Sequence, residues 1–331
     1  MTITQYESTD GFTVSELIRL AAEHSLGIEV NDVSAQFSQT PVFSGRILAH
    51  EVQPGLIATA SDLTYLSDGG LSSNAESALL CGVLLRGVDE ERMEVGGYGW
   101  ITRKLERPCL LGYSTTTSFR HPTVTSQQSC SAGFMLRRDF FDQFGKDITD
   151  DGLAALREFF DVDFRVETLA RSSRITDLAR RYLEHPYSGQ LGRLFLESNT
   201  LSLVIEFAEQ LKRERKMEAL IGRRHYDRVL EARDFLDANL VAPPKTLELA
   251  RHVGVNLTTL QVNFKAAFGT TIFGYVRAQR LQMARVLLLE HDLTIAEAGY
   301  RVGFASPAAF TAAYRRHFGR PPGWDVLRYR Q

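Results

Sequence analysis

The spacing of hydrophobic and polar positions changes at about residue 140 of the chain. Before this point, short apolar runs such as 45–49, 55–59 and 77–85 alternate with breaks that carry glycine or proline. Runs of this length between turn-forming residues are typical of β-strands. Many short strands at close spacing predict a β-sandwich or a β-barrel for the first part of the chain.

From residue 138 onward, apolar positions recur every three or four residues, which is the period of an α-helix. Helices are predicted over 138–144, 150–160, 175–183 and 191–212. The charged segment 212–216 predicts an exposed helix end followed by a linker. We therefore expect an α+β protein with two domains, which comprise residues 1–221 and 222–331.

The last hundred residues contain an internal repeat, in which 256–269 matches 306–319 at an offset of fifty residues. Both copies start with a residue that caps helices, Asn256 or Ser306, and both end in Phe-Gly. Asn and Ser side chains accept hydrogen bonds from the free N–H groups of a helix start. Gly269 and Gly319 can adopt the left-handed conformation that ends a helix. Each copy therefore predicts one capped helix.

A shorter helix and a tight glycine turn precede each repeat copy. The predicted helices are 246–253, followed by Gly254, and 294–302, followed by Gly303. The second turn is one residue longer, and Ala250 and Gly299 occupy matching positions where two helices must approach closely. A helix, a glycine turn and a capped helix make a helix-turn-helix motif.

A long amphipathic helix is predicted between the two motifs, over 273–290. Two motifs held rigidly by such a helix can enter successive major grooves, which lie about 34 Å apart on one face of DNA.

These segments resemble the DNA-binding domain of AraC/XylS transcription regulators. The segment 271–284 looks like that family's linker helix, and 295–304 with 318–322 looks like its C-terminal signature. The resemblance covers roughly residues 225–328. It implies an all-α domain of two helix-turn-helix motifs, preceded by a cupin-like β-barrel with helices that senses an effector. It also implies a non-enzymatic regulator of transcription, usually an activator, with double-stranded DNA and RNA polymerase as partners.

A second resemblance concerns 190–201, which is similar to the helix before the DNA-binding domain in the siderophore-responsive, pyochelin-regulator-like subgroup. It makes an iron–siderophore complex a candidate small-molecule effector. Helices at this place serve dimerisation in the wider family, so a homodimer through the helix from Leu191 to Leu211 is expected. No cofactor is expected besides the effector.

The family's base-reading positions fall early in the second helix of each motif. Carried over to this chain, they are Thr258, Gln261, Val262, Ala308, Thr311 and Ala312. Glutamine can bond an adenine with two hydrogen bonds, so Gln261 is the strongest candidate. Many relatives carry arginine where this chain has Val262 and Ala312, so the second motif is expected to anchor the protein more than to read bases. Candidate phosphate contacts, each of which could instead be an ordinary solvated cation, are Lys265, Arg301, Arg315 and Arg316.

Composition and charge agree with a sensor joined to a nucleic-acid binder. From residue 222 onward there are 16 basic and 9 acidic residues, a net charge of +7, whereas the rest of the chain carries −9. No stretch reaches the roughly 18 apolar residues of a membrane span, and the start lacks a secretory signal. Three cysteines without CxxC spacing favour a reducing cytoplasm.

Some residues of the first part leave alternatives open. The histidines could bind a metal but show no ligand motif, and the cysteines could sense redox but fit buried strands better. Two aromatic residues could line a pocket or belong to the core. The residues concerned are His24, His50, His121, Cys81, Cys109, Cys130, Tyr98 and Trp100. No catalytic residue and no metal site are expected, because GxSxG, P-loop and GxGxxG motifs are absent from the sequence. A DNA-repair methyltransferase can carry a similar DNA-binding module, but it needs a reactive cysteine near the N-terminus. No cysteine precedes Cys81 in this sequence, which argues against that class of enzyme.

Overall fold

The computed structural model describes residues 5–23, 28–31, 40–144, 152–290 and 293–329. The chain divides into two compact units, Met1–Glu214 and Arg215–Gln331. None of the helices in the described residues is long and apolar enough to cross a bilayer.

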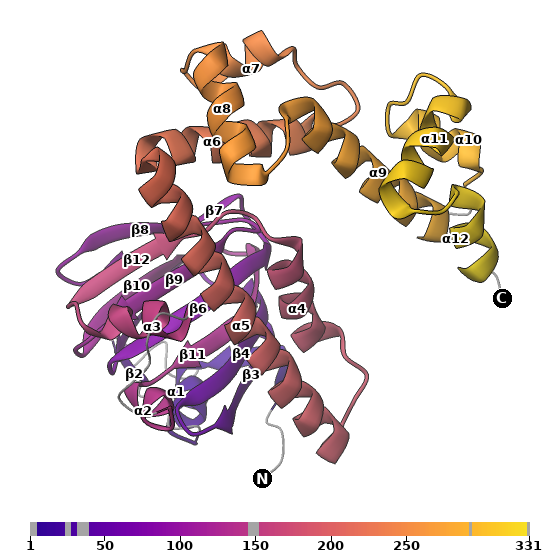
Figure 1. Ribbon diagram of the computed structural model, residues 1–331. Coiled ribbons are helices and arrows are strands. Elements are labelled where there is room, and N and C mark those ends of the chain that lie inside the picture. Colours follow the sequence, from indigo (N-terminus) through magenta and orange to yellow (C-terminus); the bar gives the residue numbers. More distant parts are fainter. Residues whose placement is uncertain (1–4, 24–27, 32–39, 145–151, 291–292, 330–331) are drawn as a thin grey trace. The chain divides into compact units, whose positions relative to one another are not determined.

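The first unit contains two antiparallel β-sheets (Figure 1). One has seven strands, in the order β1 (Gln5–Thr13), β3 (Pro41–Gln53), β4 (Leu56–Tyr65), β11 (Gln128–Leu136), β6 (Ala78–Arg86), β9 (Pro108–Tyr113) and β12 (Phe164–Thr168). The other has five, in the order β2 (Ile28–Asn31), β5 (Gly69–Ala75), β10 (Thr117–Thr123), β7 (Glu90–Val95) and β8 (Gly99–Lys104). The strand-rich prediction is thereby confirmed. Among the described strands no ladder joins the two sheets, so the expected cupin-like closed barrel is not confirmed.

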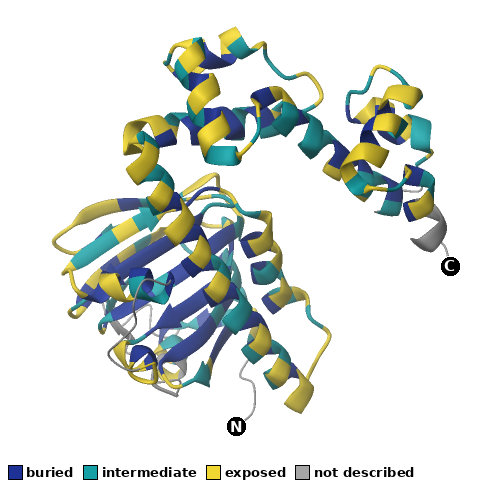
Figure 2. Ribbon diagram, in the orientation of Figure 1, coloured by how far each residue is buried: buried dark blue, intermediate teal, exposed yellow. Residues whose placement is uncertain are grey.

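Helices cover one face of the seven-stranded sheet. They are α2 (Arg138–Asp142), α3 (Gly152–Arg157) with a 3₁₀ turn (Glu158–Phe160), α4 (Ser173–Glu184) and α5 (Gly189–Ile221), whereas α1 (Val14–Glu23) follows β1. Because side chains alternate along a strand, residues such as Leu79 and Phe134 pack against Phe207 of α5 in one core. The opposite face carries a second core with Ile57 and Met135. Figure 2 shows this sheet as the most continuously buried part of the unit.

The helix α5 is longer than the sequence predicts. It does not end at the charged segment 212–216 but continues to Ile221. The reason is that Glu214 is buried, where its carboxylate accepts hydrogen bonds from the backbone N–H of Ala170, at 2.8 Å, and from the Gln210 amide, at 2.7 Å. The break comes at Gly222, whose φ of 82° is a conformation that favours glycine.

Beyond the end of α5, the second unit has seven helices among its described residues: α6 (Arg223–Ala238), α7 (Thr246–His252), α8 (Leu257–Phe268), α9 (Ile272–Glu290), α10 (Ile295–Arg301), α11 (Pro307–Phe318) and α12 (Pro322–Tyr329). They form two cores. Leu260 and Phe264 of α8 lie in the first, and Phe310 and Tyr314 of α11 lie in the second. The helix α9 contributes to both, with Val276 in the first core and the segment from Leu281 onward in the second. The predicted pair of motifs joined by a long helix is therefore confirmed.

Candidate functional sites: two helix faces and an internal cavity

The recognition helices α8 and α11 are capped as the repeat predicts. The Asn256 side chain accepts the N–H of Thr259 at 2.7 Å, and the Ser306 hydroxyl accepts the N–H of Ala309 at 3.2 Å. Gly269 and Gly319 end the helices with φ values of 67° and 73°. Local chemistry therefore fixes where both helices begin and end.

The predicted base-reading and phosphate positions of the first motif share one exposed face. Thr258, Gln261, Val262 and Lys265 follow i, i+3, i+4, i+7 spacing and are all exposed. The opposite face carries the buried Leu260 and Phe264, so the first core fixes the direction of the exposed face. Exposed donors and acceptors on a rigid helix can reach the base edges in a major groove.

The second motif presents a hollow in place of protruding side chains. Ala308, Thr311, Ala312, Arg315 and Arg316 line one shallow, open hollow on α11. The small residues leave space, and the two guanidinium groups stand beside it. Arg301, at the end of α10, is also exposed. The structure therefore brings cations and small side chains together on α11.

The glycine that precedes the second recognition helix is required by close packing. A Cβ atom at Gly299 would lie 2.9 Å from the Phe310 ring, which is closer than side chains pack in proteins. The start of α10 is fixed by Thr294, whose hydroxyl and backbone N–H bond the Glu297 carboxylate and lower its pKa. The predicted close approach of the two helices is thus confirmed.

Arg280 of α9 connects the two motifs, a role that the sequence analysis missed. Its Nε donates to the carbonyl oxygen of Leu240 at 2.7 Å, and its two terminal nitrogens donate to Val241 and Gly303 at 2.9 Å each. Leu240 and Val241 follow α6 of the first motif, whereas Gly303 lies in the turn of the second. A single guanidinium therefore holds both motifs to the linker helix.

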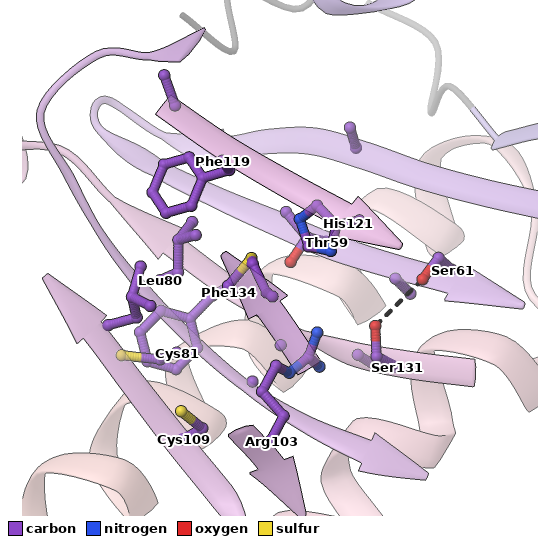
Figure 3. Close-up of a pocket in the computed structure, with 18 of the residues that line it drawn as sticks. Thr59, Ser61, Leu80, Cys81, Arg103, Cys109, Phe119, His121, Ser131 and Phe134 are labelled. Atoms are coloured by element: carbon purple, nitrogen blue, oxygen red, sulfur yellow. Dashed lines mark hydrogen bonds between the residues drawn. The ribbon is translucent and has the colours of Figure 1, made fainter. Parts of the chain in front are cut away.

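A cavity of about 340 Å³, which is partly open to solvent, lies between the two sheets of the first unit (Figure 3). This volume lies within the range of roughly 300–1,000 Å³ typical of ligand pockets. His121 and Arg103 of the smaller sheet reach it, as do Cys109 and Tyr113 of the larger one. The sequence pattern indicates His121 only as a metal candidate and gives no signal for Arg103.

Of the other candidate residues in the described part of the first unit, Cys81 and Cys109 line the cavity, whereas His50, Cys130, Tyr98 and Trp100 do not. His50 is buried, His24 lies outside the described residues, and no group of three or more His, Cys, Asp or Glu side chains in the described part could hold a metal ion. The three cysteines are buried, and burial raises the pKa of each thiol. Thiols with raised pKa values are poor redox sensors, which favours the structural interpretation. Trp100 is 58% exposed, so it belongs neither to the core nor to the cavity.

Two compact helix-turn-helix motifs on one linker helix define a DNA-binding module of a transcription regulator. Residues 249–324 match a helix-turn-helix domain family, and residues 44–222 match the family described as regulatory protein PchR N-terminal domain. The second match covers more than half of the chain. The chain therefore belongs to the AraC-type transcription regulators with a PchR-like N-terminal domain.

Curated relatives are regulators that share mainly the C-terminal part. The chain is 27% identical over 143 residues to the HTH-type transcriptional regulator ExsA of Pseudomonas aeruginosa, covering 43% of this chain and 50% of the relative. It is 35% identical over 96 residues to a probable thc operon regulatory protein of Rhodococcus erythropolis, covering 28% of this chain and 29% of the relative. The chain thus spans about half or less of the length of these relatives.

A similar solved structure is an AraC-type transcriptional regulator from Chromobacterium violaceum, which is 32% identical, with a TM-score of 0.31. The match covers 32% of this chain and 94% of that chain.

Proposed function

We propose that the protein is an effector-dependent transcription activator that binds double-stranded DNA with α8 and α11 in adjacent major grooves. The observation that carries this proposal is the pair of capped recognition helices, each with an exposed face above its own core. The net charge of +7 from residue 222 onward supports attraction to the phosphate backbone.

The two motifs have unequal roles in this proposal. In the first, Gln261 bonds an adenine, Thr258 bonds a base edge and Val262 touches a thymine methyl group. In the second, the short side chains of Ala308, Thr311 and Ala312 leave space for the DNA to approach α11 closely. Arg315 and Arg316 bind phosphates. Lys265 and Arg301 add further phosphate contacts. The operator should therefore contain one well-specified half and one looser half.

The first unit senses a small organic effector in the cavity between its sheets. The name of the matched N-terminal family supports an iron–siderophore complex as a candidate. Effector binding repositions the DNA-binding unit or frees a surface for RNA polymerase, and transcription starts.

A homodimer through α5 is the proposed assembly. Seven of the eleven apolar residues from Leu191 to Leu211 belong to or pack against the unit's own core. Leu191, Leu194 and Ile205, however, remain 66, 63 and 60% exposed. A second copy could cover them. Sedimentation of Ile205→Asp, with the equally exposed Leu220→Asp as control, tests this: only the former should shift the protein toward monomer.

DNA binding is tested by selecting sites from random duplexes with the full chain and measuring electrophoretic shifts. Gln261→Ala should lower the affinity for the selected site about tenfold and relax the preference at one base pair. The reason is that a bidentate contact favours the right base over the wrong one by about 1–3 kcal/mol. Gln279→Ala, which removes a glutamine of α9 for which the described part of the chain shows no side-chain hydrogen bond, is the matched control. An unchanged base preference would refute base reading by Gln261, and no shift with any duplex at low salt would refute DNA binding.

A further inference from the structure

The cavity of the first unit exists because a row of small residues crosses the larger sheet. Strand register places Ala49 beside Thr59, Thr59 beside Gly133, Gly133 beside Gly82, and Gly82 beside Cys109. All five line the cavity. A Cβ atom at Gly133 would lie 2.0 Å from the carbonyl oxygen of Cys81, so only glycine fits there.

The cavity is apolar at one end. The neighbouring row on the larger sheet includes the paired Leu80 and Leu111, and the smaller sheet adds Phe119 and Met93. Phe119 packs edge-on against Tyr113, with ring centroids 5.1 Å apart. This end suits a flat or branched hydrocarbon group and offers little to water.

The other end is polar, as Figure 3 shows for Ser61, Ser131, His121 and Arg103. The two serine hydroxyls are 3.1 Å apart. His121 is two residues beyond Phe119 on β10, so it faces the same side of its strand. Its pKa is lowered to about 4, first by burial and then by the positive charge of Arg103, so its imidazole is neutral at pH 7.

Arg103 is the one charged side chain among the described residues that line the cavity. One of its terminal nitrogens, Nη1, lies 3.3 Å from the Glu91 carboxylate, whose other oxygen accepts the Ser129 hydroxyl at 2.8 Å. Within the described residues no hydrogen-bond partner is recorded for the rest of the guanidinium. A guanidinium only donates hydrogen bonds, so its remaining N–H groups can bind an acceptor that enters the cavity.

We infer that the cavity binds an organic anion, with an apolar body against Leu80 and Phe119 and an acidic head group on Arg103. This inference rests on the proposed effector-sensing function and names the ligand class. The head group accepts hydrogen bonds from the free edge of Arg103 in the geometry that guanidinium makes with carboxylates. The cavity volume of about 340 Å³ lies at the lower end of the range of roughly 300–1,000 Å³ typical of ligand pockets, which fits a small molecule.

Two fluorescent probes with the same rings test the charge of the ligand. The anionic probe is 8-anilinonaphthalene-1-sulfonate, and the uncharged one is N-phenyl-1-naphthylamine. Both are titrated into the full-length protein and its variants. Arg103→Gln should weaken the anionic probe at least about tenfold, the equivalent of about 1.4 kcal/mol, and leave the uncharged probe within twofold. Glu91→Gln should have the opposite effect and raise the affinity for the anionic probe several-fold, because Arg103 loses its competing carboxylate.

A cavity-filling variant locates the probes. Thr59→Phe places a large ring in the row of small residues and should weaken both probes. If Thr59→Phe alone behaves as expected and Arg103→Gln does not weaken the anionic probe, the anionic class is wrong while the sensing site stands. If neither probe binds the unmodified protein, or Thr59→Phe affects neither, the cavity is not a ligand site and the sensing role falls with it. Electrophoretic shifts of the same variants report DNA binding separately.

Discussion

Replacing Arg280 with methionine should loosen the DNA-binding unit between its two motifs. The guanidinium makes three hydrogen bonds to backbone carbonyls, of which those to Leu240 and Gly303 are partly buried and that to Val241 is exposed. A hydrogen bond from a charged group contributes about 1.5–3 kcal/mol, and the exposed carbonyl can bond water instead. Counting the two partly buried bonds at the lower value gives a loss of about 3 kcal/mol.

Thermal unfolding of the second unit measures this loss. For a unit of this size, about 1 kcal/mol corresponds to about 4 °C in Tm, so Arg280→Met should lower Tm by about 12 °C. Arg280→Lys keeps the positive charge but cannot bond all three carbonyls in the same geometry. Its Tm should therefore lie between those of the unmodified protein and Arg280→Met. The affinity for a two-groove DNA site should also drop, because the recognition helices are no longer held at one spacing.

The matched control is Arg277→Met, which removes an arginine from the same helix. Within the described residues no side-chain hydrogen bond of Arg277 is recorded, so its loss should leave Tm nearly unchanged. Equal unfolding temperatures for the two methionine variants would refute the connecting role of Arg280. Hydrogen exchange at residues 240–241 and 303 should rise only in Arg280→Met.

Three further outcomes are expected. The first unit should lose up to about 3 kcal/mol of stability as the pH falls from 6.5 to 4. The folded pKa of His121 is about 4, so the unfolded chain binds more protons than the folded one between these pH values. In urea unfolding, His121→Gln should lack this part of the loss. Asn256→Ala and Ser306→Ala should each destabilise the second unit by about 1 kcal/mol in urea unfolding, and no change would show that the caps are dispensable. Lys265→Ala should reduce the slope of log affinity against log salt by about 1 with unchanged base preference, whereas an altered preference would contradict a phosphate contact.

The DNA-binding unit could be predicted from the sequence because its signals are local. Asn256 and Ser306 cap helices within three residues of themselves, and Gly269 and Gly319 end them. A repeat then shows that the same local signals occur twice. The connecting role of Arg280 could not be predicted, because its partners lie 23 to 40 residues away in the chain. The sequence of α9 does not indicate which backbone carbonyls an arginine will contact.

The first unit was predicted only as a class, because its decisive contacts are long-range. The predicted end of α5 lies nine residues before the observed one. The sequence indicates that Glu214 is exposed, because its hydrogen-bond partner Ala170 lies 44 residues away in the chain. The row of small residues across the sheet depends on strand register, and a shift of one residue would turn these side chains to the other face. A pattern of apolar runs is compatible with a closed barrel or with two sheets, and it does not distinguish them.

The lining of the cavity favours an occupant with two chemically different ends. Water can fill the polar end, where Arg103 and the serine hydroxyls bond it, but the end at Leu80 and Phe119 offers no such partners. A molecule with one acidic and one apolar end satisfies both. At a hundred times its Kd, such a ligand would stabilise the folded first unit by about 2.7 kcal/mol. Only the part of its binding energy by which it prefers one folded conformation over another can shift the conformation of the sensor.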